Sequence, residues 1–231
     1  DSKINYNTAY SYLQKASDGP DAHVLGLAAL AGMVMMGVGC RADEEEARAL
    51  AQRAVDGGLV KLAQSGDSEA RFRLGVLAFH RCGVDLDDKV MLGYFRDAGK
   101  THLQGRYFEA VCFSHGYGAP QDEGGALDIW RELASDESSG GGGLAMAQHE
   151  LGVRYRHGDG VEVDDEAAVR YFKDAAAQGH PEAHYDLGDY YHDGSGGLDK
   201  DEKLAIEYWQ LAARQGITAA QERLTEFGQT Y

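Results

Sequence analysis

The sequence predicts an all-α fold, a superhelix (solenoid) of about five helix-turn-helix repeats with a partial helix before the array and a capping helix after it. Two observations support this prediction. Residues 147–179 and 183–216 nearly superpose when aligned, and the step from Leu151 to Leu187 is 36 residues, a period typical of stacked helical hairpins. In addition, 31 glycines stand against 3 prolines. This excess of glycine alone indicates short repeated turns between close-packed helices rather than irregular linkers.

The predicted parts of one repeat are clearest in residues 145–179. A first helix, helix A, carries Leu151 on its apolar stripe, with Gly152 beside it where a neighbouring helix can approach closely. A Gly-x-Gly turn ends helix A, because glycine adopts the left-handed conformation readily. Asp164 then caps a second helix, helix B, which buries the aromatic pair 171–172. Such a hairpin cannot bury its apolar face alone and must stack on its neighbours.

Sliding this template along the chain predicts one domain over residues 1–231. Its predicted parts are an N-terminal helix in 1–19, repeats in 22–58, 68–102, 104–135, 145–179 and 181–216, a flexible insert in 136–143 and a C-terminal cap in 217–231. A second insert interrupts the array at Gly57–Asp67. The aromatic residues at helical spacing are predicted to lie in the core, and these are Tyr94-Phe95, Tyr171-Phe172, Tyr208-Trp209 and Trp130.

The repeat pattern reads A-x-x-x-L-G-x-x-Y-x-x-G-x-G-V, followed by an Asp, an aromatic pair, A-A and Q-G. This pattern resembles the Sel-one-like repeat (SLR) family, which is related to the tetratricopeptide repeats. The resemblance covers about residues 22–227 and is closest in the last two repeats. Earlier repeats depart from it, since Ala78 replaces the helix A tyrosine, Arg81 the first turn glycine, and Glu109-Ala110 the Leu-Gly pair. The resemblance implies a right-handed superhelix that scaffolds other proteins, typically without catalysis.

The charge of the chain excludes some partners. A formal net charge of -16 repels nucleic-acid phosphates and anionic lipid headgroups, so an electrostatic partner should be basic. Many of the acids fall at the start of a predicted helix B, where a carboxylate caps free N–H groups and faces the positive end of the helix dipole. Most of the acidic signal is therefore explained by helix capping, and one strongly negative edge remains.

The location of the protein is not predicted by the sequence. No window is long and apolar enough to span a membrane. The chain starts at Asp1 and shows no signal segment, which suggests a trimmed product whose targeting segment is absent or removed and leaves cytoplasm and organelle lumen open. Three cysteines are too few for a disulfide framework, so reduced thiols are expected. Pairing of Cys40 with Cys82 stays open, because the two map to nearly the same turn of consecutive repeats.

The candidate partner-binding residues lie on the face of helix A that the template leaves open, at positions equivalent to His149, Val153 and Arg156. In the earlier repeats these positions are mostly apolar, and exposed apolar patches usually mark binding sites. The predicted site consists of Met35, Phe72, Val76, Phe79, Tyr107, Val111, His149, Tyr185 and Asp189. The alternative is that the degraded repeats tilt and bury these side chains between repeats, and the sequence favours neither.

The function predicted from these features is a non-catalytic scaffold or adaptor that binds a segment of a partner protein, possibly a basic segment or a helix. No phosphate loop or nucleophile motif is present, and no cofactor is expected. His180 and His184 have the spacing of a helical zinc pair, but His180 precedes Pro181 in a turn, so no metal site is predicted. The alternative function is a permanent structural subunit of a larger assembly, which would bury its helix B surface or its ends.

Overall fold

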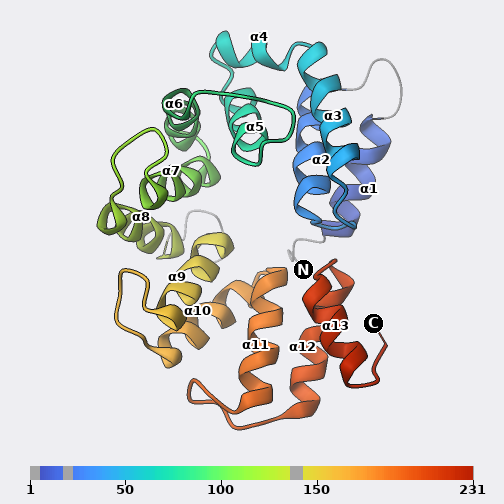
Figure 1. The fold of residues 1–231 in the computed structure, drawn as a ribbon, viewed down its shortest axis with the longest axis vertical. Helices are drawn as coiled ribbons and strands as arrows, with labels where there is room; N and C mark the ends of the chain where they lie inside the picture. Colours follow the sequence, from blue (N-terminus) through green and yellow to red (C-terminus); the bar gives the residue numbers. More distant parts are fainter. Residues whose placement is uncertain (1–5, 18–22, 136–142, 231) are drawn as a thin grey trace. The chain divides into compact units, whose positions relative to one another are not determined.

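A computed structural model describes residues 6–17, 23–135 and 143–230, and these residues form helices and turns without a β-strand (Figure 1). The all-α prediction is confirmed. In chain order the helices are α1 (Tyr6–Ser17), α2 (Val24–Met36), α3 (Glu44–Asp56), α4 (Leu59–Gln64), α5 (Ser68–Phe79), α6 (Asp88–Gly99), α7 (Leu103–His115), α8 (Glu123–Ser135), α9 (Ala145–His157), α10 (Asp165–Ala177), α11 (Pro181–Asp193), α12 (Glu202–Arg214) and α13 (Thr218–Glu226).

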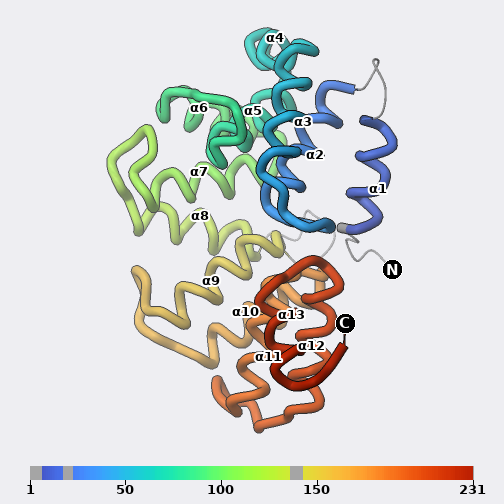
Figure 2. The backbone as a smooth tube through the Cα atoms, turned by 45° about the vertical axis from the view of Figure 1, so that its right-hand side comes forward, coloured from blue at the N-terminus to red at the C-terminus, as the bar shows by residue number. Residues whose placement is uncertain are grey.

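Within each unit, helices that follow one another pack as antiparallel hairpins, which the tube in Figure 2 traces. Helices α2 with α3, α5 with α6, α9 with α10 and α11 with α12 are in extensive contact. The described chain divides into two compact units, an N-terminal unit of residues 6–126 and a C-terminal unit of residues 127–230, and each is described by itself. A single domain over residues 1–231 stays a prediction.

The starts of the helix B segments are fixed by aspartate caps, as the sequence predicts. The Oδ1 atom of Asp43 accepts the backbone N–H of Glu46 at 2.9 Å, that of Asp164 accepts the N–H of Ala167 at 2.8 Å, and that of Asp201 accepts the N–H of Leu204 at 3.0 Å. Asp87 and Asp122 also cap the helices that follow them. Each cap satisfies an N–H group that has no partner inside the helix.

The ends of the helix A segments are fixed by left-handed glycines. Gly37, Gly116, Gly158 and Gly194 have φ between 69° and 77° and close α2, α7, α9 and α11. After α5 the same position of the repeat is held by Arg81, which has a φ of 52° and is the single non-glycine residue with a positive φ in the described ranges. A side chain with a Cβ is strained there, so this turn carries a cost that the others avoid.

A glycine on helix A interlocks with an aromatic ring on helix B in three repeats. A Cβ built on Gly188 would lie 2.4 Å from the Trp209 indole, and a Cβ on Gly152 would lie 2.6 Å from the Phe172 ring. Gly75 is equivalent, with a built Cβ 2.8 Å from Phe95. The absence of a side chain at these glycines lets the ring of helix B lie directly on helix A, and all three rings are fully buried.

The tyrosines of the aromatic pairs behave differently from their neighbours. Trp130 and the second residue of each pair are buried as predicted, but Tyr94, Tyr171 and Tyr208 are only half-buried, so the prediction that they lie in the core is wrong. Two of them stack on a helix A tyrosine instead. The ring centroids of Tyr155 and Tyr171 are 5.6 Å apart, and those of Tyr191 and Tyr208 are 5.5 Å apart. Their hydroxyl groups can therefore stay at the edge of the core.

The ends of the array and its inserts complete the fold. Helix α1 packs against α2, and α13 covers α12 with its buried Ala220 and Leu224. The insert at Gly57–Asp67 forms α4, which buries Leu59 and Ala63 and packs against α5. The predicted flexible insert falls almost entirely on residues 136–142, which lie outside the described residues. The three cysteines are free thiols.

Candidate partner-binding surface

In the N-terminal unit, three of the six predicted residues, Phe72, Phe79 and Tyr107, belong to an aromatic cluster between α5, α6 and α7. Phe108 lies at its centre, with ring centroids 5.9 Å from Phe72, 5.5 Å from Phe79 and 5.0 Å from Phe95. The rings meet edge to face or stacked, which are the arrangements that their quadrupoles favour. Helix A of one repeat is therefore joined to helix A of the next by ring contacts.

This cluster corrects part of the predicted site. Phe72 and Val76 are 7% exposed and Val111 is 9% exposed, so none of the three lies on an open groove. Phe108 of α7 packs against Phe72, and Val76 packs against α2, where a Cβ built on Gly32 would be 3.8 Å from its Cγ1. All three residues are buried, and Phe72 and Val76 are packed against a neighbouring repeat.

Three predicted residues of the N-terminal unit remain half-exposed. Met35 packs on the edge of the core formed by α2, α3, α4 and α5. Tyr107 sets its ring edge to face against Phe108, with 5.5 Å between centroids. Phe79, at the end of α5, contacts both Phe108 and the exposed Tyr117, whose ring centroid is 6.1 Å away. These side chains combine an apolar surface with access to solvent.

In the C-terminal unit, the equivalent faces are polar and centre on a buried carboxylate. Asp186 of α11 is 4% exposed. His149 of α9 donates from Nε2 to Asp186 Oδ2 at 2.8 Å, and Arg156 of α9 donates to Asp186 Oδ1. Burial alone would raise the pKa of Asp186, but the His149 hydrogen bond and the Arg156 guanidinium outweigh it and hold this pKa below its usual value. The charged carboxylate thus ties α9 to α11.

His180 completes this network at the start of α11. Its ring stacks on His149 with 4.6 Å between centroids, and it is 9% exposed. Burial, and then the neighbouring His149, lower the pKa of His180 to about 3. A buried imidazole of this kind stays neutral at physiological pH, because burial removes the water that would solvate its positive charge.

A second polar group joins α11 to α12 and α13. Trp209 Nε1 donates to Asp189 Oδ1 at 3.1 Å, and Arg223 Nε lies 3.6 Å from the same oxygen. Burial raises the pKa of Asp189, and burial followed by the Asp189 carboxylate raises the pKa of Tyr185. The structure therefore brings Tyr185 together with Asp189, and His149 together with Asp186.

Comparison with known proteins identifies the repeat. A family model described as Sel1 repeat matches residues 2–21, 24–59, 105–136, 145–180 and 181–217. The chain belongs to the Sel1 repeat family. Sel1 repeat proteins are generally non-catalytic scaffolds for protein–protein interaction. Residues 68–102 lie outside the matched ranges, yet α5 and α6 form a hairpin there like the others.

Solved structures show the same fold. A Sel1 repeat protein from Oxalobacter formigenes is 24% identical, with a TM-score of 0.59 over 94% of this chain and 88% of that one. The protective antigen c5321 of uropathogenic Escherichia coli, which displays an SLR fold, is 19% identical with a TM-score of 0.55, over 96% of this chain and 52% of that one. A Sel1 repeat protein from Klebsiella pneumoniae is 22% identical with a TM-score of 0.51, over 96% and 99%.

Several residues of this surface are missed by reasoning from one repeat at a time. Phe108, Asp186 and Arg223 each contact a predicted residue from a different helix. One sequence feature could have pointed to Asp186: it directly precedes Leu187, which the Sel1 pattern predicts to be buried. Within the described ranges no three His, Cys, Asp or Glu side chains group as a metal site would require, and no helix there is long and apolar enough to cross a bilayer.

Proposed function

We propose that this Sel1 repeat protein is a non-catalytic adaptor that holds a segment of a partner protein against its helix A side. The supporting observation is that three residues of helix A segments with apolar or aromatic side chains, Met35, Phe79 and Tyr107, are half-exposed in the N-terminal unit. The exposed residues of α3 in the same unit are mostly charged or polar, as on a solvated face. Apolar side chains that stay accessible to solvent are typical of a binding surface.

The polar networks of the C-terminal unit support the same function in another way. His149 and Asp189 are held in fixed positions by Asp186, Trp209 and Arg223. A hydrogen-bond group that is already oriented loses little conformational entropy when a partner contacts it. We propose that Tyr185 with Asp189, and His149 with Asp186, present such prearranged groups to the partner. The net charge of -16 would favour a basic segment and speed its encounter.

Affinity capture with quantitative mass spectrometry tests this proposal. The variants Met35→Ala and Tyr107→Ala should lose the partners that the unmodified chain captures, with helical circular dichroism and melting preserved. The matched control is Val90→Ala, since Val90 is an apolar residue that is 44% exposed on α6, a helix B. Loss of the same partners with Val90→Ala, and their retention with Met35→Ala and Tyr107→Ala, would contradict the proposal.

A permanent structural subunit is the second candidate, and one observation favours it. A hollow of about 370 Å³ lies between α10 and α12 in the C-terminal unit, lined in part by Leu204, Tyr208 and the 42% exposed Leu211. A neighbouring subunit could cover this apolar strip of the helix B surface. Leu211→Asp should then abolish association and leave partner capture through Tyr107 unaffected, as size-exclusion chromatography with light scattering would show.

A further inference from the structure

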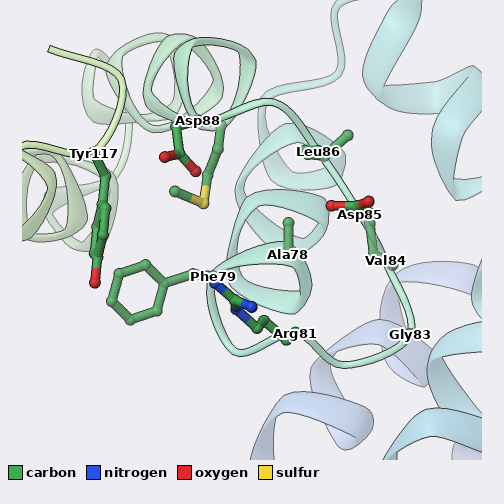
Figure 3. Close-up of a pocket in the computed structure, with 10 residues that line it drawn as sticks. Ala78, Phe79, Arg81, Gly83, Val84, Asp85, Leu86, Asp88 and Tyr117 are labelled. Carbon is green, nitrogen blue, oxygen red and sulfur yellow. The ribbon is translucent and has the colours of Figure 1, made fainter.

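An open cleft of about 580 Å³ lies at the turn end of α5 in the N-terminal unit. Figure 3 shows Ala78 at its centre, with Phe79 and Tyr117 on one side and the loop of Gly83, Val84, Asp85 and Leu86 on the other. The loop joins α5 to α6, and Tyr117 comes from the turn after α7. Two consecutive repeats therefore contribute to the cleft.

The cleft lies where this repeat departs from the Sel1 pattern. Ala78 occupies the helix A position that Tyr155 and Tyr191 fill in the last two repeats, where each tyrosine stacks on a helix B tyrosine. Alanine leaves this side of α5 without a ring. Arg81, in the strained left-handed position, stands where those repeats have Gly158 or Gly194. Both departures fall on residues that line the cleft.

The lining combines an apolar wall with exposed carboxylates. Phe79, Val84 and Leu86 are half-buried, Met91 is buried, and Tyr117 is 39% exposed. Asp85 and Asp88 are exposed at the cleft, against one guanidinium, that of Arg81. The whole chain adds a negative field with its net charge of -16. A basic ligand is therefore favoured over an acidic one.

The shape indicates a peptide rather than a small compound. A second hollow of about 600 Å³ shares Leu86 and Asp88 with the first and continues past Asp87 and Lys89 to the turn at Gly116–Pro120. The two hollows meet at an aspartate, so an extended chain that crosses from one to the other passes a carboxylate. Such a layout suits an apolar side chain followed by Lys or Arg.

We propose that this cleft, here named the Ala78 cleft, binds a short segment of a partner protein through one aromatic or large aliphatic side chain flanked by a lysine or arginine. The apolar side chain packs against Ala78, Phe79 and Met91 in the cleft, and the basic residue pairs with Asp85 or Asp88. The inference rests on the proposed adaptor function and names the chemistry of the partner that the adaptor takes.

Selection from a random peptide library on the full chain tests the proposal. The enriched peptides should share an apolar residue next to Lys or Arg. By fluorescence polarisation, Ala78→Tyr should raise Kd about tenfold or more, because it adds a ring at a residue that lines the cleft. Ala49→Tyr, the same change at an exposed site on α3, is the control and should leave Kd unchanged.

A second variant covers the case in which Ala78→Tyr fails to fold. Asp85→Asn with Asp88→Asn, at two exposed positions, should weaken binding and flatten its salt dependence. No enrichment, an acidic consensus, or full affinity in both cleft variants would overturn the proposal. Failure of this proposal and failure of the adaptor function can be told apart. Ala78→Tyr tests the cleft and leaves Met35 and Tyr107 unchanged, whereas partner capture with Met35→Ala and Tyr107→Ala tests the adaptor function.

Discussion

The same two positions of the repeat are filled by Phe72 and Phe79 in α5 and by His149 and Arg156 in α9. In the N-terminal unit these positions contribute rings to a cluster around Phe108. In the C-terminal unit they donate hydrogen bonds to a carboxylate, that of Asp186. Each pair joins one helix A to the next, so a single backbone geometry is stabilised by ring packing in one unit and by charge pairing in the other.

This difference shows which features the Sel1 fold requires. The aspartate caps, the left-handed turn positions and the glycine under the helix B ring occur in both units. They fix the hairpin itself. The chemistry between successive helix A segments varies, so the fold does not require one kind of contact at those positions. The apolar cluster leaves ring edges accessible at Phe79 and Tyr107, whereas the charge pairs of the other unit are largely satisfied internally.

The largest expected changes in the free energy of unfolding come from alanine substitutions at the equivalent residues Phe72 and His149. Phe72→Ala should lower the free energy of unfolding by about 3 to 5 kcal/mol, because it empties a buried ring site. His149→Ala should cost less, about 1.5 to 3 kcal/mol, since Arg156 still pairs with Asp186. Urea unfolding followed by circular dichroism measures both. Equal costs would mean that the two units are not stabilised by different chemistry.

In either unit, a Cβ added at the helix A glycine that lies under the helix B ring should destabilise the protein. Gly188→Ala places a Cβ 2.4 Å from the Trp209 ring and should destabilise the protein by about 1 to 3 kcal/mol. Gly93→Ala is the matched control within α6, because a Cβ there meets no atom within 4 Å. It should stabilise the helix by about 0.5 to 1 kcal/mol. Thermal melts of the two variants should shift in opposite directions.

The charge-paired unit should also respond to acid. The pKa of His180 is about 3 in the folded state, against an ordinary value of 6.5. As the pH falls below 6.5, His180 therefore becomes protonated in the unfolded chain before it does so in the folded chain. The contribution of His180 to the free energy of unfolding, complete above pH 6.5, is lost progressively as the pH falls towards 3. Between pH 7 and 5 the loss attributable to His180 should be about 1 to 2 kcal/mol.

The control for this pH dependence is a pair of glutamine variants. His180→Gln should flatten the fall in stability between pH 7 and 5, whereas His157→Gln, at the exposed last residue of α9, should leave it unchanged. Denaturant unfolding at each pH gives the slopes. If His180→Gln retains the full slope of the unmodified protein, the buried imidazole is not its source.

The smallest expected change in stability concerns the turn after α5, where Arg81 replaces the glycine of the repeat pattern. Arg81→Gly should stabilise the protein by about 0.5 to 1 kcal/mol, since glycine adopts a φ of 52° without strain. Arg81→Ala removes the same charge but keeps the Cβ, and should bring no such gain. Chemical denaturation of the two variants therefore separates backbone strain from charge.

The features predicted correctly from the sequence are those set within one hairpin. The caps at Asp43, Asp164 and Asp201 and the close approach at Gly152 depend on residues near each other in the chain. The burial of Phe72 was not predictable in this way, because it depends on Phe108 in a repeat where the pattern is degraded. The pairing of His149 with Asp186 spans 37 residues and two repeats. A pattern aligned one repeat at a time contains no information about such contacts.

Site-specific photo-crosslinking tests most directly whether partners are held on the helix A side. Benzoylphenylalanine would replace Phe79 or Tyr107 on that side, and Val90 or Leu211 on helix B segments, both exposed by more than two-fifths. One partner protein should crosslink from Phe79 and Tyr107 and not from Val90 or Leu211. Crosslinks to that partner from the helix B positions alone would contradict it.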